Sequence, residues 1–161
     1  MKSKDYTIRE VTDKVAKSTI TEHILRSLPQ WFGIEDALME YVQGVGDSTF
    51  FACYDSDDAV GFISLIFHND HTAEIYVMGI LEPYHRQGIG RALVKASEEK
   101  LTEAGYKLFM VKTLGESHSD PSYKKTRKFY RSMGFFPLEE IPAIWGEANP
   151  CLIMVKPLSG S

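Results

Sequence analysis

Residues 82–94 read EPYHRQGIGRALV, a stretch in which two glycines lead directly into a helix-like segment. Gly88 and Gly90 stand one residue apart between basic side chains, and the residues after them have helical spacing. The first turn of a helix has backbone N–H groups without partners inside the helix, and these groups attract anions. Because glycine lets a phosphate approach the backbone closely, the stretch predicts a pyrophosphate cradle, with a plain strand-to-helix turn as the alternative.

Two other nucleotide-binding motifs do not match these residues. A P-loop requires G-x-x-x-x-G-K-[ST], which is missing from the stretch. A dinucleotide-binding fingerprint requires a third glycine at position 93, where Leu93 stands. Both motifs are therefore excluded.

The composition predicts one globular domain over residues 1–161, with a loose tail at residues 157–161. An apolar content of 43% and an aromatic content of 12% are enough for a hydrophobic core. The net charge of −4, without a dominant basic stretch, argues against a nucleic-acid partner. No apolar run approaches the roughly 18 residues that a membrane span needs, and the N-terminal MKSKDYTIRE lacks the apolar part of a signal peptide.

The chain has two cysteines, Cys53 and Cys151, whose separation matches no metal-binding spacing. We expect two buried thiols in a reducing, cytoplasmic environment. Because neither thiol lies near the glycine motif in the sequence, a covalent acyl-cysteine is disfavoured.

Hydrophobic spacing predicts strands and helices in alternation. Expected strands are residues 6–9, 49–54, 60–67, 73–80, 107–113, 135–138 and 152–155. Expected helices are a first one capped by Thr12 or Asp13 and ending near residue 28, followed by residues 34–44, 90–104 and 123–133. The strand, helix and strand around the glycine loop suggest a parallel crossover, and the remaining strands suggest an antiparallel sheet.

The glycine stretch resembles the acetyl-CoA signature of the GNAT superfamily of N-acetyltransferases, written Q/R-x-x-G-x-G/A. Gly88 and Gly90 fit its two small positions, whereas His85 stands where the family prefers Gln or Arg. Residues 128–135, KFYRSMGF, are similar to the F-Y-x-x-x-G-F signature of the same family. The resemblance covers nearly the whole chain and is most specific from about Glu74 to Phe135.

The resemblance implies an α/β fold with a mostly antiparallel, twisted mixed sheet, splayed between its fourth and fifth strands and flanked by about four helices. Acetyl-CoA, the acetyl donor, would lie in that split, with its pyrophosphate on backbone N–H groups and its pantetheine arm paired like an added strand. Gly79 would ease that close approach. Tyr123 stands where the family often has an Asn in contact with pantetheine, and Ser122 is the alternative there. The implied cofactor-binding residues are Met78, Gly79, Ile80, His85, Arg86, Gln87, Gly88, Ile89, Gly90, Arg91 and Tyr123.

Acetyl transfer to an amine first requires removal of a proton. An alkylammonium has a pKa of ~10.4, so holding it neutral at pH 7 costs roughly 4–5 kcal/mol. Glu74 is the candidate base, because it lies 14 residues before Gly88 within an Ala-Glu-Ile triplet, as the catalytic glutamate does in histone acetyltransferases of the superfamily. His68 and His71 on the adjoining turn are rival bases, and a structural or solvated glutamate is the other interpretation.

The resemblance also places the Tyr130 hydroxyl near the cofactor sulfur, where it would protonate the departing thiolate. A structural tyrosine is the alternative. The N–H of Ile80 is expected to meet the oxyanion. Together these residues imply direct transfer in a ternary complex, without a metal.

The sequence is less specific about the acceptor. In such folds the first two helices and their turn form the wall of the acceptor pocket, which makes Trp31, Phe32 and Ile34 candidates for lining it. Core packing explains the same residues equally well. A small amine, an amino acid, an aminoglycoside-like compound and a protein lysine or N-terminus remain open as acceptors, and a homodimer is an open option.

We therefore predict an acetyl-CoA-dependent N-acetyltransferase. One alternative is transfer of a longer acyl group, or transfer to a hydroxyl acceptor. The other is a CoA-binding sensor domain without turnover.

Overall fold

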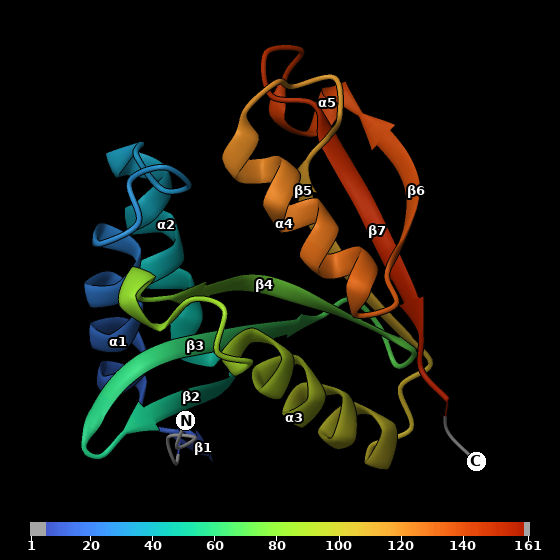
Figure 1. Cartoon of the computed structure of the whole chain (residues 1–161). Helices are drawn as coiled ribbons and strands as arrows, with labels where there is room; N and C mark the ends of the chain where they lie inside the picture. Colours follow the sequence, from blue (N-terminus) through green and yellow to red (C-terminus); the bar gives the residue numbers. More distant parts are fainter. Residues whose placement is uncertain (1–5, 160–161) are drawn as a thin grey trace. The chain divides into compact units, whose positions relative to one another are not determined.

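The computed structural model describes residues 6–159, whose contacts divide into two compact units (Figure 1). The first unit contains the chain up to Ile66 together with Val77–Glu99. The second unit contains Phe67–Tyr76 and the chain from Lys100 onward. Strand β4 begins in the second unit and ends in the first, so the chain passes between the units in the middle of a strand.

Within residues 6–159, seven strands form one sheet in the order β1-β2-β3-β4-β5-β7-β6. The pair β4–β5 is parallel, with Thr72–Ile75 beside Leu108–Val111. The pairs β1–β2, β2–β3, β5–β7 and β6–β7 are antiparallel. The predicted mixed α/β class is therefore confirmed. The strands are β1 (Tyr6–Glu10), β2 (Thr49–Asp55), β3 (Asp58–Phe67), β4 (Thr72–Ile80), β5 (Leu108–Leu114), β6 (Phe136–Ile141) and β7 (Cys151–Pro157).

The helices agree with the four that the sequence predicts, with one short addition. The α-helices are α1 (Lys14–Arg26), α2 (Glu35–Gly44), α3 (Ile89–Glu103), α4 (Pro121–Ser132) and the unpredicted α5 (Pro142–Trp145). Two 3-10 turns, η1 (Val45–Asp47) and η2 (Glu82–Tyr84), accompany them. Asp13 caps α1 by accepting a 2.8 Å hydrogen bond from the Ala16 N–H, as expected. No helix in this described part of the chain has the length and hydropathy needed to cross a bilayer.

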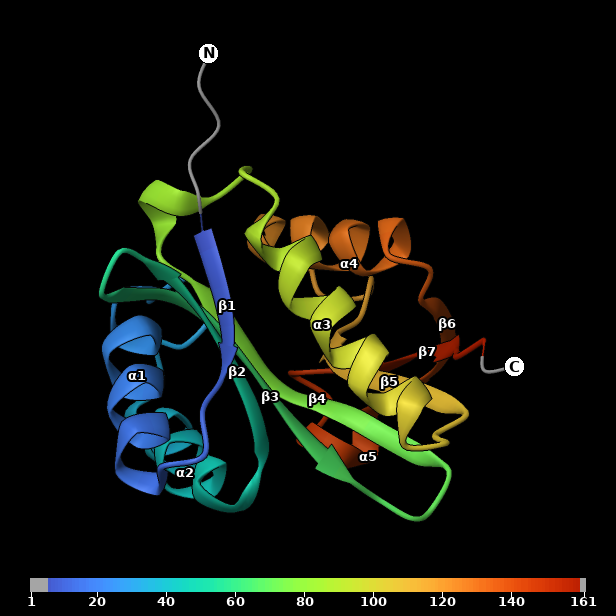
Figure 2. The ribbon, with the colours of Figure 1, turned by 90° about the horizontal axis from the view of Figure 1, so that it is seen from below.

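In the first unit, strands β3 and β4 touch helices through bare glycine backbone. A Cβ on Gly79 would lie 3.1 Å from Ile24 Cγ2 and 3.3 Å from Leu28 Cδ1, so β4 packs closely against α1. A Cβ on Gly61 would lie 3.2 Å from Ile89 Cγ2, at the start of α3. Figure 2 shows α1 and α2 on one face of these strands and α3 on the other.

A buried lysine fixes α1 to the segment after α2. The Lys17 ammonium donates to the carbonyl of Ser48 at 2.6 Å and to that of Gly46 at 3.1 Å. These two carbonyls replace the water that a 6% exposed lysine has lost. These two hydrogen bonds fix the segment between the end of α2 and the start of β2 against α1.

The second unit has an aromatic core under α4. The Phe135 ring lies 5.4 Å from that of Phe109 and 5.6 Å from that of Tyr130, centroid to centroid. Phe109 and Phe135 are fully buried, so α4 and the strand after it are held to β5 by apolar contact.

The segment predicted as a loose tail begins inside a strand. Pro157 is the last residue of β7, and buried Leu158 donates its N–H to the Lys107 carbonyl at 2.8 Å. Residues 160–161 of that segment lie outside the described residues, as do residues 1–5 of the polar N-terminal stretch.

Candidate active site

The glycine loop joins β4 to α3 through a fixed series of turns. The Leu81 N–H bonds to the Val60 carbonyl at 2.9 Å, which ties the start of the loop to β3. Further on, Arg86 has φ 63° and Gly88 has φ 82°. Helix α3 follows at once, and its first helical bond runs from the Ala92 N–H to the Gly88 carbonyl at 3.0 Å. The loop therefore presents the N–H groups that open a helix, as the sequence predicts.

Gly88 is needed for its backbone angle. A Cβ there would meet no heavy atom within 4 Å, so the chain itself leaves the space open. The positive φ, however, strains any L side chain. Gly88 thus has both features expected of a glycine in this loop, a relaxed backbone angle and open space beside it.

Four side chains, which we call the loop staple, hold this loop: Tyr6, Asp55, Tyr84 and Gln87. The Tyr84 hydroxyl donates to Asp55 Oδ2 at 2.8 Å, and the Tyr6 hydroxyl donates to Gln87 Oε1. The hydrogen bond to the Asp55 carboxylate raises the pKa of Tyr84, which keeps its hydroxyl a donor. The two tyrosine rings also meet edge to face at 6.0 Å. Sequence reasoning missed the staple, because its members come from three distant segments.

His85, at the position where the family prefers Gln or Arg, contacts the end of β4. Its Nε2 lies 2.6 Å from the Ile80 carbonyl oxygen. Its ring also meets the Trp31 ring edge to face at 6.1 Å, so one of the predicted acceptor-pocket residues lies at the loop. Phe32 instead packs against Tyr41, and Ile34 is 68% exposed at the start of α2.

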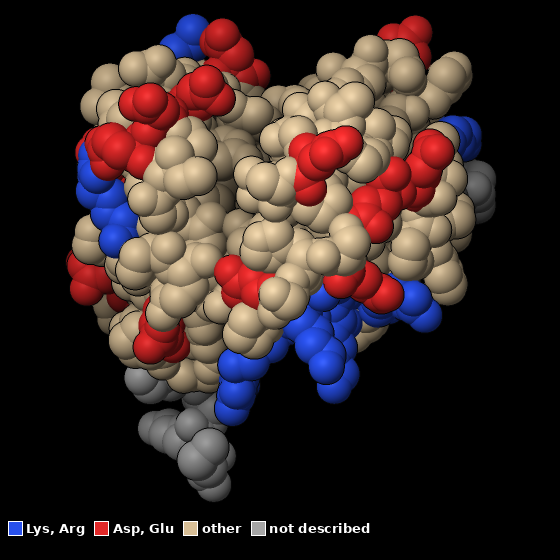
Figure 3. Space-filling model, turned by 90° about the horizontal axis from the view of Figure 1, so that it is seen from above, with Lys and Arg blue, Asp and Glu red and all other residues tan. Residues whose placement is uncertain are grey.

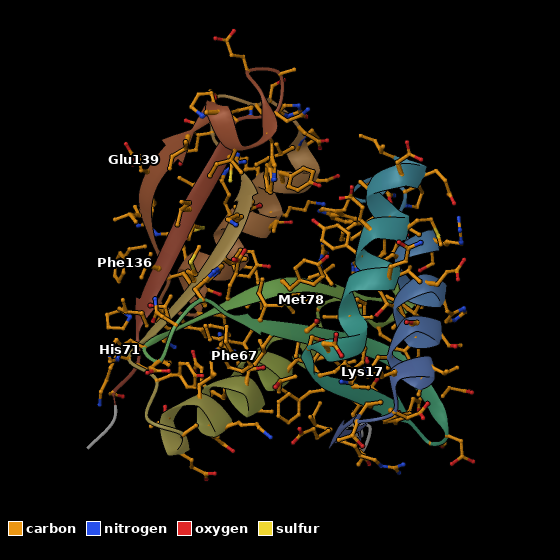
Figure 4. All side chains as sticks on the ribbon, turned by 180° about the vertical axis from the view of Figure 1, so that it is seen from behind. Lys17, Phe67, His71, Met78, Phe136 and Glu139 are labelled. Atoms are coloured by element: carbon orange, nitrogen blue, oxygen red, sulfur yellow. The ribbon has the colours of Figure 1, made fainter. Side chains whose placement is uncertain are left out.

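The predicted pantetheine-pairing residues form the last part of β4. Met78 and Ile80 are half-buried and Gly79 is buried. Because β4 packs closely on α1 at Gly79, a side chain at this position would be crowded. This packing is a reason for the glycine other than the close approach of the cofactor that the sequence suggested. Figure 4 shows Met78 on β4 and His71 in the turn that precedes this strand.

Glu74, the predicted base, is nearly removed from solvent in the second unit. Its side chain is 5% exposed, and its Oε1 lies 2.6 Å from Nε2 of His68 and 3.5 Å from Nζ of Lys112. His68, considered above as a rival base, is thus a direct partner of Glu74. His71, the other rival, is exposed. Lys112 was not predicted, although a single charge within the apolar strand LFMVKTL is a visible signal.

Tyr130, the predicted acid, is buried at 5% exposure near the end of α4. Its ring packs against Phe129 at 5.4 Å as well as against Phe135. Tyr123 lies in the first turns of the same helix and is half-buried. Asp120 caps this helix by accepting a 2.8 Å bond from the Ser122 N–H. Glu74, Tyr123 and Tyr130 therefore belong to the second unit, and the glycine loop belongs to the first.

Both cysteines are buried. Burial raises the pKa of Cys53 to about 11 and also raises the pKa of Cys151. A thiol of this kind is a poor nucleophile near neutral pH. Among residues 6–159, no group of three His, Cys, Asp or Glu side chains is placed to hold a metal ion.

Acidic side chains are spread over the face drawn in Figure 3 and do not gather in one patch. Two acidic side chains of the first unit, Glu22 and Glu35, are already paired. Arg26 donates to both carboxylate oxygens of Glu35 at 2.8 and 2.9 Å, and this guanidinium lowers the pKa of Glu35. Arg26 also binds Glu22 at 2.8 Å.

Comparison with known proteins gives a family. The sequence model of the Acetyltransferase (GNAT) family matches residues 18–135. An uncharacterized N-acetyltransferase of Chlorobaculum tepidum, CT2212, is 29% identical over 105 residues, which are 63% of this chain and 61% of that relative. The match thus spans less than two thirds of the relative's length.

Solved structures share the fold. The ribosomal-protein-S18-alanine N-acetyltransferase from Escherichia coli has a TM-score of 0.74 at 18% identity, covering 98% of this chain and 96% of that chain. An aminoglycoside 6′-N-acetyltransferase complexed with coenzyme A has a TM-score of 0.76 at 18% identity, covering 96% and 98%.

Proposed function

Because the chain belongs to the acetyltransferase (GNAT) family, we propose that it transfers an acetyl group from acetyl-CoA directly to a primary amine. The observation that carries this proposal is the loop between β4 and α3. Arg86 and Gly88 have positive φ values there, and the space beside Gly88 is open. Such a loop offers several backbone N–H groups to one anion, which suits a diphosphate.

We assign the diphosphate of acetyl-CoA to the N–H groups of residues 86–91, with Arg86 and Arg91 adding positive charge. The backbone of residues 78–80 is assigned to the pantetheine arm. The carbonyl oxygen of Ile80 already contacts His85. We assign the other backbone group of Ile80, its N–H, to the thioester oxygen. Acetyl-CoA itself supplies an activated acetyl thioester.

We assign the proton transfers to two residues of the second unit. Glu74 takes a proton from the acceptor ammonium, and its contacts with His68 and Lys112 hold the carboxylate in place for this role. Tyr130 gives a proton to the departing thiolate, and its ring is held firmly among aromatic neighbours. Because the family model matches residues 18–135 without a break, we infer that residues 1–161 act as one acetyltransferase domain.

The acceptor class follows from the family and its relatives. Two proteins of the same fold are named for an aminoglycoside and for an alanine of ribosomal protein S18. We therefore infer that a primary amine, on a small molecule or a protein, is the acceptor here. Trp31 is the best-supported lining residue because it lies against His85, and Phe32 and Ile34 belong to the same segment.

The test is a thiol-release assay with acetyl-CoA and a panel of primary amines, with the product identified by mass. We expect CoA release that depends on an amine and yields the acetylated amine. Binding of CoA without release with any amine would favour a sensor domain. Faster release from a longer acyl-CoA, or acetylation of a hydroxyl, would favour the other alternative.

A further inference from the structure

The carboxylate of Glu74 is held at one of its two oxygens. His68 Nε2 at 2.6 Å and Lys112 Nζ at 3.5 Å both contact Oε1. The side chain of Glu74 is 5% exposed, whereas those of His68 and Lys112 are 37% and 30% exposed. A buried carboxylate needs such partners, because an unpaired buried charge is costly. Contacts to either oxygen would satisfy charge balance. Contact of both partners with Oε1 is therefore a more specific arrangement than charge balance requires.

The backbone fixes where His68 stands. The His68 N–H donates to the Thr72 carbonyl at 3.0 Å, which closes the turn between β3 and β4. Within the turn, Asn69 Oδ1 accepts from the N–H groups of His71 at 2.8 Å and Thr72 at 2.9 Å. The imidazole is therefore presented by an ordered turn.

The sheet fixes the position of Lys112 in a similar way. Glu74 on β4 is in register with Met110 on the parallel strand β5. Because side chains alternate along a strand, Lys112 lies on the same face as Met110, two residues further on. The His68 imidazole and the Lys112 ammonium thus reach Oε1 from different segments of the second unit.

We propose that His68 is a positioning residue for acetyl transfer: with Lys112 it anchors Oε1 of Glu74, so that the other oxygen, Oε2, takes the proton of the acceptor ammonium. This inference rests on the proposed function. In the step, one N–H bond of the ammonium breaks and one O–H bond to Oε2 forms. The nitrogen keeps the electron pair, which is then available to attack the thioester carbonyl carbon. Fixed orientation of a base is worth a large factor in rate.

Several charged or titratable groups surround the pair. Lys112 faces it from β5, and Cys151 on β7 is close enough that Glu74 raises its pKa while Lys112 lowers it, both by less than burial does. Asp70 and His71 lie on the same turn as His68, and both are exposed.

Three variants of the whole chain test the role: His68→Ala, His68→Gln and the matched control His71→Ala. We expect His68→Ala to lower kcat by about 10–100-fold while KM for acetyl-CoA stays unchanged, because the anchor is lost. His68→Gln restores a neutral donor and recovers part of kcat. Recovery in His68→Gln beside a loss in His68→Ala separates an anchoring hydrogen bond from a merely structural role.

Wild-type kcat in a folded His68→Ala protein would overturn the proposal, as would an equal effect of His71→Ala. Should the His68 variants fail to fold, Lys112→Gln must lower kcat with an unchanged KM for acetyl-CoA, and a wild-type kcat in that variant overturns the proposal. If the wild type transfers no acetyl group, the proposed function fails separately. Then the NMR signal of the His68 ring still decides whether the two side chains are in contact: it must shift more in Glu74→Gln than in His71→Ala, and an unmoved signal contradicts the anchor.

Discussion

Single residues carry the function through backbone angle as much as through side-chain chemistry. Gly88 illustrates this, because its φ of 82° strains an L side chain although a Cβ there would meet no heavy atom within 4 Å. Gly105 offers a natural comparison, since its φ is 89° and a Cβ there also meets nothing within 4 Å. Gly105 ends α3, whereas Gly88 begins it.

We predict that Gly88→Glu raises the Kd for CoA at least about 10-fold, because a carboxylate repels the diphosphate and the backbone is strained by ~1–2 kcal/mol. Gly105→Glu introduces the same strain and charge away from the loop. It should lose a similar amount of thermal stability and still bind CoA as the wild type does. Calorimetric titration of both variants checks this, and equal loss of CoA binding in the two would refute the placement.

Tyr130→Phe tests the assigned acid. The ring contacts with Phe129 and Phe135 are kept, so the fold should be unaffected. Loss of the proton donor should lower kcat about 100-fold, while the Kd for CoA changes less than about two-fold. Steady-state kinetics beside a binding titration make the comparison, and turnover at the wild-type rate would reject the acid role.

The buried thiols should be inert in the folded protein. Since the pKa of Cys53 is raised from 9.0 to about 11, and that of Cys151 is also raised, both stay protonated at pH 8. A thiol reagent should label neither cysteine in the native state and both in denaturant. Above about pH 9 the unfolded chain releases these protons first, so these thiols make stability fall as the pH rises toward 11. Rapid native labelling at pH 8 would contradict the burial.

At the scale of elements, the loop depends on strands that are distant from it in sequence. Strand β1 supplies Tyr6 and strand β2 supplies Asp55, and both bind side chains of the loop. The loop is thereby held before any ligand arrives, which lowers the ordering cost of binding.

We predict that Tyr84→Phe weakens CoA binding by about 3–10-fold, as the loss of one hydrogen bond worth about 1 kcal/mol would do. Tyr54→Phe is the control, because the contact of Tyr54 with Arg9 is made by the ring, which the substitution keeps. Titration with CoA should separate the two variants. Equal affinities of the Tyr84→Phe and Tyr54→Phe variants for CoA would show that the loop staple does not position the loop.

Elements with strong periodicity were predictable, whereas contacts between distant elements were not. The strands and the four longer helices agree with the predicted ranges within a few residues, and the Asp13 cap was anticipated. Helix α5 has four residues, too few to show a helical period. The His68–Glu74 contact could not be read from the sequence, because it depends on how the turn between β3 and β4 orients the His68 ring.

For the whole molecule, the assigned chemistry is divided between the two units. The loop assigned to the diphosphate lies in the first unit, and Glu74 and Tyr130 lie in the second. Strand β4 belongs to both, and it carries Glu74 near its start and Ile80 at its end. One strand thus contributes the assigned base and, six residues later, the N–H assigned to the thioester oxygen.

The most direct test of the account is an NMR titration of the amide groups with CoA and, separately, with pantetheine, which lacks the diphosphate. The account predicts that CoA shifts the amide signals of residues 86–91 and that pantetheine leaves them unchanged. If CoA binds and those signals stay in place, the loop does not hold the diphosphate, and the account is contradicted.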